Sequence, residues 1–288
     1  MKTSFVQELK LKIMHSGNAL NLLIALNVAV FLFIKILQVF EVLFGQVDLI
    51  SGWLMRQLIL PAATEDLMYK PWTILTYMFM HTGFFHILFN MLWLFWLGRI
   101  FLDFLNNRQF VFTYITGGLC GAVLFLLLYA LHPLFNISAS GTALLGASAS
   151  VGAIIVATAT LVPDFSIRML LLGNVKLKYL ALAFIIISLL GISGDNAGGN
   201  FAHLGGAALG FVYIRNLNKG RDWSKAFLKK ARSPKFKVHK NEKIKYNDMA
   251  PDQEYIDAIL DKISQSGYKS LSKKEKDALF KASKREEN

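Results

Sequence analysis

The sequence predicts an all-α, polytopic membrane protein with six transmembrane helices and a small helical hairpin near its C-terminus. The 288-residue chain is 54% hydrophobic and only 17% charged, whereas a soluble domain carries about 25% charged residues. Several apolar stretches approach or exceed the roughly 20 residues that cross a bilayer as a helix. Lysines and arginines recur in alternate connections between these stretches, as in cytoplasmic loops.

Hydropathy places the expected spans near residues 20–44, 84–105, 110–132, 146–163, 177–194 and 201–215. Basic residues precede the first span, lie between the second and third and between the fourth and fifth, and follow the sixth. The segments 133–145 and 195–200 contain no lysine or arginine. The positive-inside rule therefore predicts that both termini are cytoplasmic. We expect an integral, multi-pass protein of the plasma (inner) membrane.

Four regions follow from this pattern. They are a cytoplasmic N-terminal segment (1–17), a six-helix membrane domain (18–216), a basic juxtamembrane linker (217–250) and a cytoplasmic helical hairpin (251–288). From residue 215 onward, 20 lysines and arginines stand against 11 acids, a balance of +9 within the net charge of +12. The linker is typical of a positive-inside segment, and its basic run is expected to lie on anionic lipid. We expect no nucleic-acid partner for a membrane-anchored chain.

The two helices of the hairpin are predicted from local signals. The stretch YIDAILDKIS has apolar residues at helical spacing, and Gly267 is placed to end that helix. Ser272 and Glu275 form a capping box that opens a second helix.

The first loop, residues 46–72, is too apolar for a loop in water. Its residues Leu49, Trp53, Leu54 and Leu58 predict an amphipathic segment that lies in the outer interface.

Two of the expected spans carry a polar residue and glycine on one helical face. In the fourth span, Ser148 and Gly152 are four residues apart and share a face. In the sixth, His203 shares a face with Gly206 and Gly210, a GxxxG pair that permits close helix approach. We therefore expect these spans to pack closely and to bring the Ser148 hydroxyl to the His203 imidazole.

The second span adds His86 and Asn90, which are four residues apart and also share a face. A serine hydroxyl becomes a nucleophile when a base takes its proton, and histidine is the usual base. We expect Ser148 and His203 to form such a pair. Side chains of His86 and Asn90, with the backbone N–H of Ser148, can donate to an oxyanion. No acid is expected near His203, which favours a dyad over a triad.

Each of these residues alone also has a purely structural interpretation. A serine near a helix start is commonly a cap, and a single intramembrane histidine or asparagine commonly forms an interhelical hydrogen bond. Four such residues at a consistent depth favour a site instead. No metal is expected because the chain has no HExxH motif, and no aspartyl pair because Glu41 and Asp103 lie near opposite ends of their spans. His81 and His132 are interpreted as interfacial residues.

At three places the sequence resembles the rhomboid intramembrane serine proteases. These are HTGFFHILFNMLWLFWLG, GASA at 146–149 and AHLGGAALG at 202–210, within a resemblance that covers roughly residues 18–216. The family's H-x-x-x-N matches His86 and Asn90, and its G-x-S matches Gly146 to Ser148. The resemblance implies Ser148 as nucleophile and His203 as its histidine. It also implies a six-helix fold with a water-filled site open to the outer face, cleavage of transmembrane substrates near their outer ends, and no cofactor.

The chain departs from the family pattern at several positions. Ala149 follows the expected nucleophile, where the family usually has glycine, and Gly152 stands where some members place an aromatic residue that supports the histidine. Trp53 and Arg56 are three residues apart rather than adjacent. Asp103 lies near the position of an acid that often follows the glycine of the second span. We expect these departures to affect substrate preference and rate more than the reaction.

The sequence thus predicts a serine endopeptidase that cleaves single-span or polytopic membrane-protein substrates with a Ser–His dyad and needs neither metal nor cofactor. A proteolytically silent relative that binds transmembrane clients is the alternative, but that usually accompanies loss of the serine or the histidine. A transporter is a third class. It is disfavoured because we see no inverted repeats in the sequence.

Overall fold

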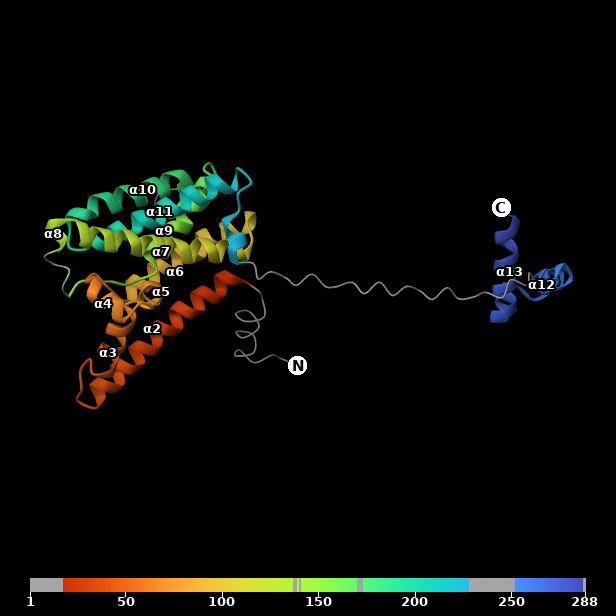
Figure 1. The fold of residues 1–288 in the computed structure, drawn as a ribbon, viewed down its shortest axis with the longest axis horizontal. Coiled ribbons are helices and arrows are strands. Elements are labelled where there is room, and N and C mark those ends of the chain that lie inside the picture. The colour runs from red at the N-terminus through yellow and green to blue at the C-terminus, as the bar shows by residue number, and fades with distance from the viewer. Residues whose placement is uncertain (1–17, 137–138, 140, 170–172, 228–251, 287–288) are drawn as a thin grey trace. The chain divides into compact units, whose positions relative to one another are not determined.

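The computed structural model describes residues 18–136, 139, 141–169, 173–227 and 252–286. These residues belong to two compact units, one within residues 1–231 and one within residues 232–288. The first unit is a bundle of long helices, and the second is a pair of shorter helices (Figure 1). The chain is mostly helical, as the sequence predicts.

The first unit contains ten α-helices and two short strand pairs among its described residues. The helices are α2 (Ala19–Leu43), α3 (Ile50–Leu58), α4 (Thr64–Tyr69), α5 (Thr73–Thr76), α6 (Phe84–Phe104), α7 (Asn107–Leu131), α8 (Pro133–Asn136), α9 (Ser148–Leu161), α10 (Leu177–Leu190) and α11 (Ala197–Leu217). The strands are β1 (Leu60–Pro61), β2 (Ala143–Leu144), β3 (Ser166–Met169) and β4 (Gly173–Lys176). Each predicted span contains one helix. Of these, α2, α6 and α7 are long and apolar enough to cross a membrane, and α9 and α10 are shorter apolar helices.

Local capping explains several helix starts. Asn18 accepts a hydrogen bond from the backbone N–H of Leu20 at 2.9 Å and so caps α2. Asn106 and Gln109 form a capping box at the start of α7, in which each side chain accepts from the other's backbone N–H. These caps satisfy donors that the first turn of a helix leaves without intrahelical partners.

The centre of the bundle is a three-helix contact between α7, α9 and α11. A Cβ added to Gly206 would meet the Ala149 carbonyl of α9, and one added to Gly210 would meet the carbonyl of Ala153. The backbones of α9 and α11 therefore touch along the glycine stripe of α11. Small residues permit this approach in membrane proteins, where van der Waals packing and hydrogen bonds drive helix association.

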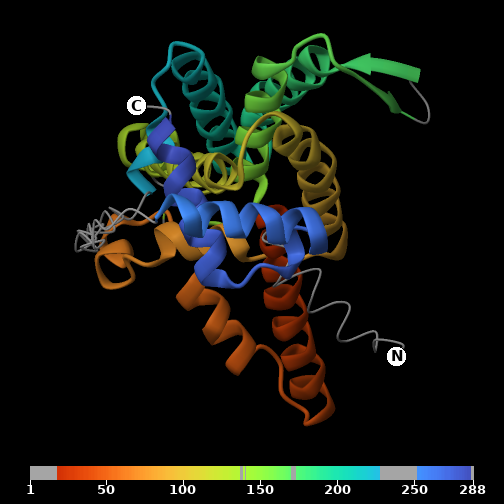
Figure 2. The ribbon, with the colours of Figure 1, turned by 90° about the vertical axis from the view of Figure 1, so that its right-hand side faces the viewer.

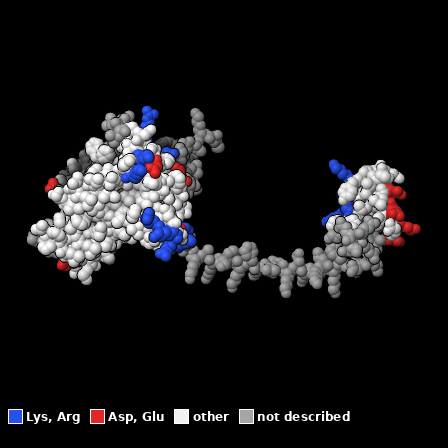
Figure 3. Space-filling model, turned by 90° about the horizontal axis from the view of Figure 1, so that it is seen from above, with Lys and Arg blue, Asp and Glu red and all other residues white. Residues whose placement is uncertain are grey.

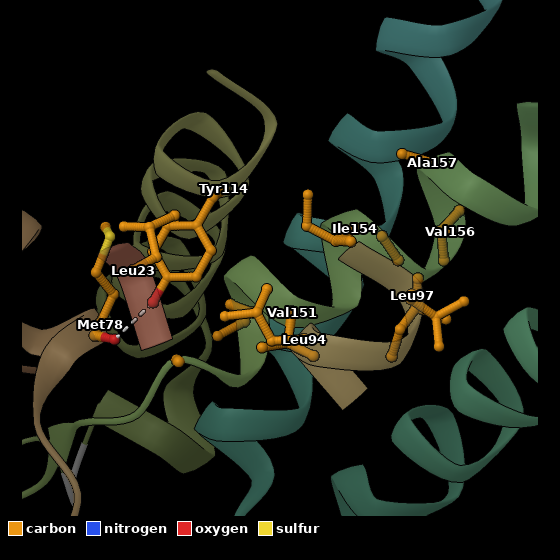
Figure 4. Packing of buried hydrophobic residues seen from close by; sticks show 14 of the residues in the cluster. Leu23, Met78, Leu94, Leu97, Tyr114, Val151, Ile154, Val156 and Ala157 are labelled. Atoms are coloured by element: carbon orange, nitrogen blue, oxygen red, sulfur yellow. Dashed lines mark hydrogen bonds between the residues drawn. The ribbon is translucent and has the colours of Figure 1, made fainter. Parts of the chain in front are cut away.

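A buried hydrogen-bond chain joins α2, α7 and the segment before α6. The Asn27 side chain donates to the Tyr114 hydroxyl at 3.1 Å. That hydroxyl donates to the Met78 carbonyl at 3.3 Å (Figure 4). Apolar side chains of α6 and α9, including Leu94 and Val151, belong to the same hydrophobic core. The segment that leads into α6 is thus fixed to α7 from one side.

The connection between α9 and α10 is an antiparallel β-hairpin, β3 paired with β4, that projects from the bundle (Figure 2). At its base, the Asp164 carboxylate accepts hydrogen bonds from Lys178 at 2.8 Å and Lys176 at 3.0 Å. Bonds from Lys178 and then Lys176 lower the pKa of Asp164 to about 2. Ion pairs as well as the β-hairpin therefore connect this end of α10 to the end of α9.

A second polar cluster joins the end of α11 to the start of α7. The Arg108 guanidinium forms a 2.8 Å ion pair with Asp222, and Ser224 donates to the same carboxylate at 2.6 Å. On the face shown in Figure 3, the bundle carries mainly uncharged side chains, and its lysines and arginines gather toward one end. This distribution agrees with helices that pass through lipid and expose basic residues on one side.

The second unit has the two helices that the sequence predicts, α12 (Gln253–Ser266) and α13 (Lys273–Glu286). Gly267 follows α12 with φ of 77°. The predicted capping box is confirmed: Ser272 N–H donates to the Glu275 carboxylate at 2.6 Å, and Glu275 N–H donates to the Ser272 hydroxyl at 3.4 Å. A small core of Ile256, Ile259 and Leu271 holds the helices together.

Candidate active site

Ser148 is the first residue of α9, and a turn that requires glycine places it there. Gly146 has φ of 111°, a conformation that side-chain-bearing residues rarely adopt, and its N–H donates to the Tyr77 carbonyl at 3.0 Å. Further back in the same segment, β2 pairs with β1, with Leu144 opposite Leu60. Because Ser148 opens the helix, its own N–H has no intrahelical acceptor. The hydroxyl and this N–H are therefore close together at a helix start.

His203 lies in the second turn of α11 and meets this serine. Its Nε2 is 2.8 Å from the Ser148 hydroxyl, which is within the distance for proton transfer to a general base. The contact depends on the close approach of α9 and α11 at Gly206, three residues along from His203. The structure thus brings together the two residues that the sequence pairs.

The neighbouring serine, Ser150, has a different environment. Its side chain is fully buried, and its hydroxyl lies 3.8 Å from the Met78 sulfur. A Cβ added to Gly118 of α7 would stand 2.6 Å from that hydroxyl. Ser150 therefore packs into the core toward α7, away from His203.

His86 and Asn90 lie on α6, beside the turn that precedes Ser148. A Cβ added to Gly146 would come within 2.8 Å of the His86 ring, so that the ring lies directly against this glycine. The Asn90 amide donates one hydrogen to the His86 carbonyl at 2.9 Å. An amide nitrogen carries two hydrogens, and the second is not used by this bond. The structure brings His86 to the site and links Asn90 to it through the same helical turn.

His81 is closer to the site than its interpretation as an interfacial residue requires. Its side chain is only 2% exposed, and its ring meets the His86 ring edge-on at 5.0 Å between centroids. Its Nε2 accepts from the Ala147 N–H at 3.4 Å, so His81 supports the backbone just before Ser148. The interfacial interpretation is therefore wrong for His81. His132, by contrast, is exposed at the C-terminal end of α7.

Two residues of α10 also contact the histidine, and the sequence analysis missed both. The Phe184 ring lies 5.5 Å from the His203 ring at 36° between planes. The Ser188 hydroxyl is 3.4 Å from His203 Nδ1. Ser188 could have been noticed as the one polar residue in the apolar run from Leu180 to Leu190. Phe184 carries no such signal, because phenylalanine is ordinary in a membrane helix.

The site contains nucleophile, base and amide donors, which suits acyl transfer. In the part of the chain that the structure describes, no group of three or more His, Cys, Asp or Glu side chains could hold a metal ion.

Comparison with protein families identifies the family of this chain. The model of the Rhomboid domain matches residues 69–219, which is more than half of the chain. The chain therefore belongs to the rhomboid family. It is an integral membrane protein of a family whose members are generally serine intramembrane proteases, although some are inactive.

The remaining comparisons say less about function. The model of a family of unknown function, DUF6576, matches residues 244–285, a range that includes α12 and nearly all of α13. A search of curated proteins finds no match.

Proposed function

We propose that this protein is an active intramembrane serine endopeptidase with a Ser148–His203 dyad. The hydrogen bond of 2.8 Å between the Ser148 hydroxyl and His203 Nε2 carries this proposal. His203 takes the hydroxyl proton as Ser148 attacks the scissile carbonyl, and then gives it to the leaving amine. A water molecule, deprotonated by the same histidine, hydrolyses the acyl-enzyme and restores the free serine.

Three groups stabilise the oxyanion in this proposal. The Ser148 N–H at the start of α9 is one donor, because helix starts present unpaired N–H groups. The second hydrogen of the Asn90 amide and the His86 ring are the others. The position of His86 against Gly146 supports this role, because the turn that carries Ser148 passes next to the imidazole. Gly146 itself leaves the room that this approach needs.

The substrates in this proposal are transmembrane helices of other membrane proteins. All six helices α2, α6, α7, α9, α10 and α11 span the membrane, both termini are cytoplasmic, and the site opens to the outer face. A helical peptide bond has its carbonyl in a hydrogen bond to the residue four ahead. The substrate must unwind locally before Ser148 can attack it, which favours glycine, proline or small polar residues near the outer end of its helix.

The remaining parts have simpler proposed roles. Residues 18–216 form the catalytic domain and need no cofactor, the linker at 217–250 lies on anionic lipid, and the hairpin at 251–288 is a separate cytoplasmic module. The departures Ala149 and Gly152 tune rate and preference rather than the reaction.

The test is covalent labelling by a fluorophosphonate, together with cleavage of a model transmembrane substrate, in the parent, Ser148→Ala and Ser150→Ala proteins. We expect labelling and cleavage in the parent and in Ser150→Ala, and neither in Ser148→Ala. Ser150→Ala is a matched control because it removes the same hydroxyl two residues away, from a position that faces Met78. A folded parent that neither labels nor cleaves would instead be a silent, client-binding relative. Labelling that survives in Ser148→Ala would show that another residue is the nucleophile.

A further inference from the structure

We propose that α10 positions the histidine, with Ser188 selecting its tautomer and Phe184 holding its ring. This inference rests on the proposed dyad and adds two positioning residues to it. Both lie on one face of α10, because they are four residues apart. Neither touches the reacting atoms, and both act through His203.

The hydrogen bonds of Ser188 determine which nitrogen of His203 carries the proton. The Ser188 hydroxyl has a single hydrogen and donates it to the Phe184 carbonyl at 2.8 Å. Only its lone pairs are then left for His203 Nδ1, at 3.4 Å, so that Nδ1 must be the donor. In the neutral ring the proton is therefore on Nδ1, and the lone pair on Nε2 faces Ser148.

This tautomer is the one that general-base catalysis requires. With the lone pair on Nε2, the ring accepts the Ser148 proton across the 2.8 Å contact. With the other tautomer, Nε2 would already hold a proton and could not act as base. In serine proteases with an acid next to the histidine, the acid makes this selection. Here a neutral hydroxyl, only 1% exposed and so shielded from exchange with bulk water, fills that position.

Phe184 occupies the space that the missing side chain at Gly152 leaves open. A Cβ added to Gly152 would come within 2.5 Å of the Phe184 ring at Cζ and 2.7 Å at Cε1. The same Cβ would be 3.6 Å from the His203 carbonyl, so this space borders the histidine. The tilted ring contact between Phe184 and His203, at 5.5 Å, limits rotation of the imidazole. The Phe184 ring thus fits beside His203 because Gly152 has no side chain.

The first experiment replaces Ser188. We expect Ser188→Ala to lower kcat about tenfold, the scale of one hydrogen bond, with little change in KM because no substrate contact is removed. Ser188→Thr should restore most of the rate, because a threonine hydroxyl in a helix makes the same bond to the carbonyl four residues back. Ser193→Ala is the control. Its hydroxyl also donates to a backbone carbonyl of α10, that of Leu190 at 3.0 Å, but it is exposed.

A spectroscopic readout separates tautomer selection from a structural role. In protein labelled with ¹⁵N-histidine, the two ring nitrogens of His203 report which one is protonated, and a His203→Gln spectrum identifies their signals. We expect a protonated Nδ1 in the parent and in Ser188→Thr, and a mixture of tautomers in Ser188→Ala. This measurement does not depend on turnover. It therefore tests the inference even if the protein proves to lack protease activity.

The second experiment combines substitutions at positions 152 and 184 to test whether the two side chains share one space. Gly152→Ala should displace the Phe184 ring and lower kcat, and the smaller Phe184→Leu should lower it as well by freeing the imidazole. The double variant should lose less than the sum of the two single losses in free energy, because leucine leaves room for the alanine methyl group. Losses that simply add would show that the two positions do not share this space.

Parent-like kcat and an unchanged ¹⁵N spectrum in Ser188→Ala would overturn the role of Ser188. That result is distinct from failure of the proposed function, in which the parent itself would not be labelled at Ser148.

Discussion

Replacing Gly206 by alanine should separate the dyad without touching either of its members. A Cβ at this position would lie 2.8 Å from the carbonyl carbon of Ala149, where ordinary contact begins at 3.4 Å. The carbonyl oxygen of Ala149 would lie closer still, so the helices must part by more than the difference of about 0.6 Å between these two distances. The Ala149 backbone cannot rotate away as a flexible side chain would. The shift is consequently expected to pass to His203, three residues along the same face of α11.

The size of the effect follows from the geometry of the dyad. A retreat of this size would lengthen the contact from His203 to Ser148 from 2.8 Å to about 3.4 Å, beyond the reach of about 2.6–3.2 Å that general-base catalysis needs. Misplacement by about 1 Å lowers rates by as much as 10²-fold. We expect kcat to fall by tenfold to a hundredfold. Overpacking should also lower the free energy of unfolding by about 1–3 kcal/mol.

The assay is cleavage of a model transmembrane substrate, with kcat expressed per folded molecule and thermal unfolding measured in the same detergent. Gly210→Ala provides the comparison, because its Cβ would meet the Ala153 carbonyl in the same manner but two turns from His203. Gly210→Ala should lower the free energy of unfolding by a similar amount and should lower kcat much less. Gly194→Ala is the control, since its Cβ would make only a 3.5 Å contact. Equal losses of kcat at positions 206 and 210 would refute the positional reasoning, as would parent-like turnover of Gly206→Ala.

Three further predictions follow. Asn90→Ala should lower kcat by about 10²–10³-fold with nearly unchanged KM if its amide donates to the oxyanion. Unchanged kcat with reduced thermal stability would instead show that Asn90 only contacts its own helix. Truncation after Phe227 should leave cleavage in detergent largely intact, because it retains the pair between Arg108 and Asp222; a folded but inactive product would make the tail part of the enzyme. Hydrogen bonding from Lys262 lowers the pKa of Glu275 from 4.5 to about 2. This contribution to stability is present above pH 4.5 and lost as the pH falls toward 2, so circular dichroism of a 244–288 fragment should show less helix across that range, and a Glu275→Gln fragment a smaller change.

Patterns along the chain were sufficient for the helices and for the pairing of Ser148 with His203. Apolar run length marks the long helices, and helical spacing places Ser148 and the glycine stripe of α11 where close packing makes them meet. Gly206 and Gly210 signal that approach directly, since only glycine permits backbones to touch there. These are local signals that need no knowledge of which helices are neighbours elsewhere.

The supports of the histidine could not be predicted in the same way. Phe184 and Ser188 reach His203 only because α10 packs beside α9 and α11, and no spacing along the chain encodes that neighbourhood. The sequence shows that position 152 lacks the aromatic residue of some family members. It does not show that Phe184 of another helix supplies an aromatic ring to His203 instead. His81 was misplaced because a histidine next to a span end resembles an interfacial residue, whereas tertiary contacts with His86 bury it.

The unequal lengths of α2 and α10 have a consequence for the surrounding lipid. At 1.5 Å per residue, the 25 residues of α2 extend about 37 Å, whereas the 14 residues of α10 extend about 21 Å, or about 27 Å with the 3-10 turn Gly191–Ser193 that follows. Both expose large apolar side chains. In the proposed topology, a hydrocarbon core of about 30 Å is therefore thinner than the length of α2, which runs obliquely to the other long helices (Figure 1), and slightly thicker than the length of α10 with its 3-10 turn. If α10 spans the bilayer, as we propose, we expect the bilayer beside it to thin slightly. In this topology, the helix that contacts His203 through Phe184 and Ser188 is therefore also one whose length does not fully match the bilayer.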